Sequence, residues 1–316
     1  DSAPASQERA AIPRTVMAAV SAERAKQTVQ MLASFGTRHT LSATDDPARG
    51  IGAAREWLRQ QLAAAGPRLQ VSLEEFDAPK SQRLPEGAKV VNVVAVLPGA
   101  DPVAAKRRYY VVGHYDSINA DRMDPKGDAP GSNDDASGCA VVLECARALA
   151  QQPLEATVVF LCTAAEEQGL VGAMLHAQSA KARGEQIAGV LNCDIVGDPS
   201  PALVVPANAD GTDFVQQSAR TIVRVFSEGL PRSLPAEELA RLRQVSAESD
   251  SPSRQLARFI FTVAAREETD VRPWVIFRPD RFLRGGDHSA FNDAGFAAAR
   301  FTAPASQCPS IDENWE

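Results

Sequence analysis

Four short polar segments carry side chains that can bind a metal ion, and three of them directly follow an apolar run. The segments are residues 113–117, 131–138, 164–169 and 192–194. Between them they supply His114, Asp134, the acidic pair Glu166 and Glu167, and Asp194. Imidazole and carboxylate groups both coordinate zinc in proteins. If the four segments meet in space, the chemistry they indicate is metal-assisted hydrolysis.

Each segment also has an ordinary interpretation. A single histidine is more often a structural residue, and Asp134 with Asp135 could cap the helix that follows them. The acidic pair could interact with a helix dipole in a first turn, and Asp194 could be a plain strand-end residue. The joint occurrence decides between these interpretations, because a buried cluster of carboxylates is very costly unless cations compensate it.

The elements that position these residues follow from apolar periodicity. Strands are predicted over residues 71–76, 90–97, 109–112, 157–163, 190–195, 203–205 and 297–302. Helices are predicted around residues 29–35 and over 51–62, 136–150, 169–181 and 212–226. The alternation of strand and helix predicts an α/β fold: a single domain with a mixed, mostly parallel sheet and helices on both faces. Ligand sites in such sheets lie beyond the carboxyl ends of the strands, so the four polar segments should converge.

The 316 residues favour one large domain. Residues 1–20 are rich in Ala, Ser and Pro and are expected to be a flexible N-terminal segment, which leaves 21–316 for the domain. Residues 229–270 are charged and interrupted by Ser and Pro, so we expect an insertion or an active-site cover there. The five cysteines form no Cys-x-x-Cys motif, and four of them lie in apolar runs that predict burial.

Composition excludes several classes of protein. A hydrophobic fraction of 44% with 23% charged residues is typical of a soluble globular chain. The net charge of -7 argues against nucleic-acid binding, which needs a basic surface. No apolar run approaches the ~18 residues of a membrane span. The chain begins at Asp1 without an initiator methionine, from which we expect a secreted or periplasmic protein, or else a shortened chain. Nothing in the sequence indicates the oligomeric state.

Taken together, the four motifs resemble those of the co-catalytic zinc aminopeptidases, whose superfamily also contains glutamate carboxypeptidase II and glutaminyl cyclase. The resemblance runs from about Met31 to the end of the chain. It implies two zinc ions, held by the ligands His114, Asp134, Glu167 and Asp194, with Asp134 bridging both ions. It also implies that Glu166 is the general base and that Asp116 orients His114. A metal pair of this kind activates the water that cleaves the peptide bond.

The sequence departs from this family at its last ligand. That ligand is usually a His in a C-terminal segment after the final core strand, here residues 297–302, and the chain stops at Glu316 where the segment should begin. We therefore expect the fifth ligand to lie beyond Glu316, which leaves one zinc site incomplete in this chain. The alternative is that His288 replaces it. Asp287 and His288 are otherwise expected beside the ligands or the substrate, whereas His39 and His176 are expected to be structural.

The function that follows is a zinc-dependent exopeptidase, an aminopeptidase that hydrolyses N-terminal residues from peptides. A glutaminyl cyclase with one zinc is an alternative, although Trp57, Trp274 and Trp315 do not lie where a cyclase pocket needs tryptophan. A carboxypeptidase would need cations for the substrate carboxylate, for which Arg281 and Arg284 are candidates. The other alternative is a catalytically impaired binding protein on the same fold.

Overall fold

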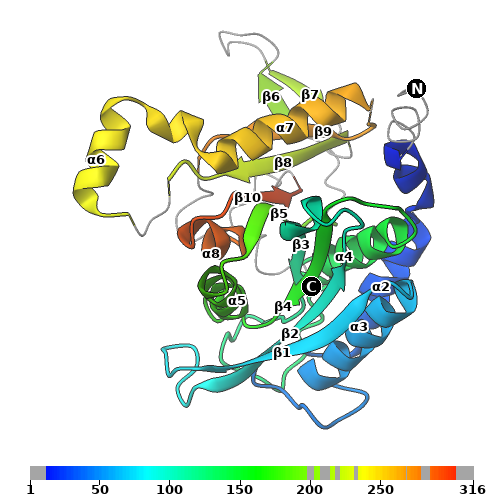
Figure 1. Ribbon diagram of the computed structural model, residues 1–316. Helices are drawn as coiled ribbons and strands as arrows, with labels where there is room; N and C mark the ends of the chain where they lie inside the picture. Colours follow the sequence, from blue (N-terminus) through cyan, green and yellow to red (C-terminus); the bar gives the residue numbers. More distant parts are fainter. Residues whose placement is uncertain are drawn as a thin grey trace.

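The computed structural model describes residues 12–197, 203–206, 214–217, 221–230, 234–267, 269–278 and 285–303. In this part of the chain, eight strands form one sheet in the order β1-β2-β4-β3-β5-β10-β8-β9 (Figure 1). Their bounds are β1 Gln70–Ala78, β2 Ala88–Leu97, β3 Arg107–His114, β4 Thr157–Thr163, β5 Gln186–Cys193, β8 Ile222–Ser227, β9 Arg272–Ile276 and β10 Ala298–Thr302. A separate hairpin pairs β6 (Leu203–Pro206) with β7 (Phe214–Gln217).

The centre of the sheet is parallel and its flanks are antiparallel. Strands β4, β3, β5 and β10 run parallel to their neighbours in that order. The pairs β1–β2, β2–β4 and β10–β8 are antiparallel, whereas β9 at the far edge is parallel to β8. The predicted mixed sheet is therefore confirmed, and the parallel centre carries the segments that hold the candidate ligands.

Helices cover both faces of the sheet, as the α/β prediction requires (Figure 1). Helices α2 (Ala22–Ser34), α3 (Ile51–Ala65) and α4 (Ala136–Leu149) lie on one face, and α5 (Val171–Ala182) and α8 (His288–Asp293) lie on the other. Adjacent residues of β3 point to opposite faces, so Val111 belongs to the core under α3 and α4 and Val112 to the core under α5 and α8. Burial on both faces explains why the central strands are continuous apolar runs.

The helix predicted over residues 212–226 is wrong. The structure has β7 at Phe214–Gln217 and β8 at Ile222–Ser227 instead. Residues 222–227 are rich in β-branched and aromatic side chains, and β8 pairs with both β9 and β10. Pairing within the sheet therefore outweighs the apolar spacing that suggested a helix.

Residues 229–270 contain defined helices in their described part. These are α6 (Ala236–Gln244), the short 3-10 helix Ala247–Asp250 and α7 (Pro252–Arg266). The Ser251-Pro252 step begins α7, because the Ser251 hydroxyl accepts a hydrogen bond from Arg254 N at 3.2 Å and proline fits the first helical position. Helix α7 packs against β8, β9 and β10.

The N-terminal region is described only in part. Residues 1–11 of the segment expected to be flexible lie outside the described residues, whereas residues 12–19 are helical. Among the helices that the structure describes, none is both long and apolar enough to span a membrane.

Candidate metal centre

The candidate ligands converge because three parallel strands end at the same level. His114 is the last residue of β3 and lies opposite Thr163, the last residue of β4. On the other side of β3, Val112 lies opposite Asn192 of β5, which places Asp194 level with His114. The carboxyl ends of neighbouring parallel strands form one edge of the sheet. The predicted meeting of these segments is therefore confirmed.

The imidazole of His114 lies between carboxylates. Its Nε2 atom is 3.0 Å from Asp134 Oδ1 and 4.0 Å from Asp194 Oδ1. Its Nδ1 atom is 3.1 Å from the main-chain oxygen of Asp116 and 3.5 Å from the Asp116 carboxylate. A proton on Nδ1 can be donated to that carbonyl, which leaves the Nε2 lone pair directed at the acidic cluster.

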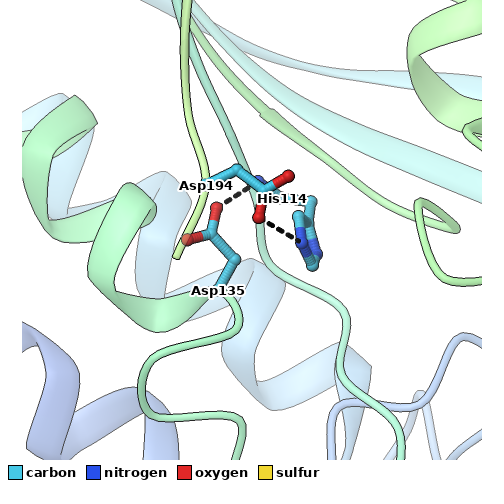
Figure 2. A group of neighbouring side chains, drawn as sticks. All are labelled: His114, Asp135 and Asp194. Atoms are coloured by element: carbon cyan, nitrogen blue, oxygen red, sulfur yellow. Dashed lines mark hydrogen bonds and ion pairs between the residues drawn. The ribbon is translucent and has the colours of Figure 1, made fainter. Parts of the chain in front are cut away.

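Two adjacent aspartates approach the centre in different ways. Among the described residues, His114, Asp135 and Asp194 each offer a ligand atom within 4.8 Å of the others, and Figure 2 shows them facing one another. The Asp135 carboxylate, however, accepts hydrogen bonds from the main-chain N–H groups of Gly138, His114 and Ile195 at 2.8, 3.1 and 3.3 Å. Asp135 thus caps α4 and joins three segments. Asp134 Oδ1 lies 3.0 Å from His114 Nε2, and the Asp134 side chain is 34% exposed. Among the described residues, Asp134 and Glu167 lie outside the three-residue group.

Glu166 and Glu167 lie in the turn between β4 and α5. The Asp116 carboxylate accepts a hydrogen bond from each of their main-chain N–H groups: Oδ1 from Glu166 N at 3.2 Å and Oδ2 from Glu167 N at 3.2 Å. The alternative that these acids interact with a helix dipole is wrong, because α5 begins at Val171 and has no acidic residue in its first turn. Asp116 therefore contacts the imidazole and fixes the backbone of the acidic pair at once.

Negative charge accumulates in this centre. Burial raises the pKa of the Glu166 carboxyl well above its ordinary value, and the carboxylates of Glu167 and Asp194 add to the rise against the opposing effect of His114. Burial likewise raises the pKa of Glu167 and of Asp135. Carboxyl groups that retain protons for lack of positive charge would ionise beside a divalent cation. Since the donors are imidazole and carboxylate, the set fits zinc.

One cation of the centre was missed in the sequence. Arg300 of β10 is almost fully buried, and its Nη2 atom lies 3.1 Å from Asp194 Oδ1. The pKa of Asp194 is raised by burial, and Arg300 opposes that rise. The available signal was an arginine inside the apolar run 297–302, where an unpaired charge would be costly.

The segment before α8 packs directly against the candidate ligands. A Cβ atom on Gly286 would lie 2.6 Å from Asp194 Oδ2, so only glycine fits there without a shift. Asp287 is fully buried and accepts a hydrogen bond from the Thr163 hydroxyl, and burial raises its pKa to about 7. The structure thus brings Asp287 beside the centre, as expected.

His288 does not join the metal-binding group of the described residues. Its Nε2 atom lies 3.6 Å from Glu228 Oε1, and the side chain is fully buried. This geometry gives no support to His288 as a replacement ligand. The C-terminal residues 304–316, with Trp315, and the candidates Arg281 and Arg284 lie outside the described residues.

The other two histidines have structural contacts. His39 Nδ1 accepts a hydrogen bond from Leu41 N at 3.1 Å, and His176 Nδ1 lies 2.5 Å from Glu74 Oε2. Cys139, Cys162 and Cys193 are buried free thiols, and Cys145 is free and half-buried.

Comparison with solved structures identifies the fold. The aminopeptidase LapA of Legionella pneumophila superposes with a TM-score of 0.59 at 16% identity, over 94% of this chain and 64% of that chain. Glutaminyl cyclase of Porphyromonas gingivalis superposes with a TM-score of 0.60 at 18% identity, over 92% of this chain and 86% of that one. At such low identity these likenesses establish the fold alone, and it is a fold that peptidases and cyclases share.

Comparison with known sequences identifies the family to which the chain belongs. A probable zinc metalloprotease of Leptosphaeria maculans is 41% identical over 289 residues, which are 90% of this chain and 64% of the relative. A second one, of Pyricularia oryzae, is 41% identical over 292 residues, 90% of this chain and 55% of the relative. The chain therefore spans a little over half of the length of these relatives. The sequence model described as peptidase family M28 matches residues 92–315, most of the chain, and the protein belongs to that family.

Proposed function

We propose that this protein is a zinc-dependent aminopeptidase that removes N-terminal residues from peptides. The observation that supports this most directly is the position of Glu166, whose backbone is held by the same Asp116 that contacts His114. A carboxylate held beside a group of metal ligands is what a hydrolase needs for proton transfer. The relatives described as zinc metalloproteases support the same reaction class.

In this proposal His114, Asp134, Glu167 and Asp194 are the residues that would hold two zinc ions. Zinc, when bound, acts as a Lewis acid on the scissile carbonyl and makes water more acidic. Glu166 takes a proton from the attacking water and delivers it to the leaving amine. Asp116 keeps Glu166 and Glu167 in place through their main-chain N–H groups. Asp194 stays in one orientation because Arg300 binds its Oδ1 atom.

The cations of the centre favour an aminopeptidase over a carboxypeptidase in this proposal. A carboxypeptidase needs a cation that pairs with the free carboxylate of its substrate. Among the described residues of the centre, the guanidinium of Arg300 is already bound to Asp194.

The proposal is tested with metal analysis and a substrate panel. The purified protein should bind about two equivalents of zinc by plasma mass spectrometry, and it should release the chromophore from aminoacyl p-nitroanilides. N-acetylated versions of the same substrates serve as controls and should not react. Chelation should abolish the activity and added zinc should restore it.

Three outcomes would contradict the proposal. Full turnover in a verified metal-free sample would exclude the zinc mechanism, and turnover of the N-acetylated substrates would exclude an aminopeptidase. Cyclisation of N-terminal glutaminyl peptides without hydrolysis of the anilides would favour a glutaminyl cyclase instead.

A further inference from the structure

A buried arginine on the N-terminal side of the family match contacts both loops that lead to His114 and Asp134. Arg38 lies between α2 and α3 and is fully buried. Its guanidinium donates to main-chain carbonyl oxygens: Nε to Tyr115 at 2.7 Å, Nη1 to Pro130 at 2.5 Å and Nη2 to Gly131 at 2.8 Å. A further bond runs from Nη1 to Leu32 at the end of α2, at 3.0 Å. Residue 115 follows His114, and residues 130 and 131 precede Asp134.

The backbone around Arg38 strengthens the same connection. Arg38 N donates to the Ser117 hydroxyl at 3.1 Å, and that hydroxyl donates to the carbonyl of Ala129 at 2.6 Å. Ala129 N in turn donates to the carbonyl of Gly36 at 2.7 Å. Three segments that are far apart in sequence are therefore tied together at one point behind the metal centre.

The chemistry of this contact requires arginine. A planar guanidinium presents five N–H groups in a fixed fork, so it can bind several carbonyls in different directions. A lysine ammonium keeps the charge but cannot span the same set. Among the described residues, the hydrogen bonds of this guanidinium go to main-chain carbonyls and none goes to a carboxylate. Its role is therefore to hold loops in place rather than to neutralise one acid.

Gly131 shows how closely the guanidinium approaches the second loop. A Cβ atom at this position would lie 2.6 Å from Arg38 Nη2 and 2.5 Å from the carbonyl oxygen of Asp134. Gly131 also has a φ angle of +47°, which glycine adopts without strain. The loop that carries Asp134 is thus built to let the guanidinium reach its backbone.

We infer that Arg38 is a positioning residue that sets the separation of His114 and Asp134 by holding their two loops together. The inference rests on the proposed zinc site and extends it to a residue outside the matched range 92–315. Because the arginine touches neither ligand side chain, it acts through the backbone. Loss of the bonds should therefore loosen the ligand geometry while leaving every ligand present.

The test compares zinc affinity in Arg38→Lys with two control variants. Arg68→Lys is the chemical control, because Arg68 also donates to main-chain carbonyls, those of Gln152 and Pro98, but away from the centre. Leu62→Ala is the stability control, because it removes a fully buried side chain from α3. Zinc affinity is measured by competition with a chromophoric chelator, stability by thermal unfolding without metal, and ligand geometry by the visible spectrum of the cobalt-substituted protein.

Arg38→Lys should lose about 10–100-fold in zinc affinity, the usual effect of removing a group that supports metal ligands. Its cobalt spectrum should change, whereas Leu62→Ala and Arg68→Lys should keep the wild-type affinity and spectrum. Wild-type affinity and spectrum in Arg38→Lys, or an equal loss in Leu62→Ala, would overturn the inference.

If Arg38→Lys does not fold, Ser117→Ala tests the same connection with the guanidinium retained. It removes the hydroxyl that joins Arg38 N to Ala129, so zinc affinity should fall below that of Leu62→Ala. An unchanged affinity in this variant would count against the inference. Absence of zinc binding in the wild type would refute the proposed function along with it, whereas normal wild-type binding with unaffected variants would refute only the role of Arg38.

Discussion

The role proposed for Glu166 leads to a prediction in which activity and stability respond differently. Replacing Glu166 with Gln keeps the shape of the side chain and keeps the main-chain bond to Asp116. It removes the group that takes the proton, and a positioned general base contributes about 10²–10⁴-fold to the rate. That factor corresponds to about 2.7–5.4 kcal/mol in the transition state, at 1.36 kcal/mol for each factor of ten. The kcat of the variant should therefore fall by about 10²–10⁴-fold.

Stability of the metal-free protein should not fall with it. Burial, together with Glu167, Asp194 and Asp287, raises the pKa of Glu166, so the ionised form is disfavoured in the metal-free centre. A neutral amide removes that repulsion, and the unfolding temperature without metal should stay the same or rise. Zinc stoichiometry should stay at the wild-type value, because Glu166 is not a proposed ligand.

The assay measures turnover of one aminoacyl anilide, zinc content and thermal unfolding on the same preparations. Glu185→Gln is a suitable control, because Glu185 lies beside Tyr110 and Arg108, at the opposite end of β3. Near-normal turnover in Glu166→Gln would remove Glu166 from its role. Loss of zinc together with turnover would show instead that Glu166 is a ligand.

Three further predictions concern the groups around the ligands. Asp116→Asn should lower zinc affinity about 10–100-fold, because the amide has one oxygen in place of the two that accept hydrogen bonds from Glu166 N and Glu167 N. Chelator competition measures the affinity, and a wild-type value would contradict the prediction. Gly286→Ala should also weaken zinc binding, because its Cβ would lie 2.6 Å from Asp194 Oδ2. Gly189→Ala is the control and should keep the wild-type affinity, because its Cβ would lie at an ordinary 3.4 Å from Leu256. Equal zinc affinity in the two variants would refute the effect of the close contact. The metal-free protein should lose stability as the pH rises from about 4 to about 7, because the folded-state pKa of Asp287 is raised to about 7 and its protonated form is the one that folding favours. Urea unfolding between pH 4 and 8 tests this, and Asp287→Asn should flatten the dependence; a slope of opposite sign would contradict it.

The sequence alone determined the strands of the parallel centre and the segments that follow them. The predicted strand 157–163 coincides with β4, and the predicted residues 90–97 and 109–112 lie within β2 and β3. These strands are buried on both faces, so their apolar runs are long and unbroken and easily recognised. Because parallel strands end at a common edge, the order of the motifs was enough to predict that His114, Asp134 and Asp194 meet.

The sequence was less informative where an apolar pattern fits more than one kind of element. Residues 222–227 have an apolar pattern that fits either element, and only pairing with β10 and β9 makes them a strand. Residues 252–266 form α7, in a region for which the sequence predicted an insertion or an active-site cover but no particular element. Local spacing does not contain the partners that decide such cases.

Only the tertiary structure shows which partner each acidic and basic side chain of the centre contacts. Asp134 and Asp135 are chemically identical neighbours, and only the three-dimensional positions of His114, Gly138 and Ile195 assign one to the imidazole and the other to the backbone. Arg300 pairs with Asp194 across two strands, and Arg38 reaches carbonyls more than 70 residues away. Buried charges must find partners, but the partners are fixed by the packing of distant segments, and no local pattern in the chain encodes that packing.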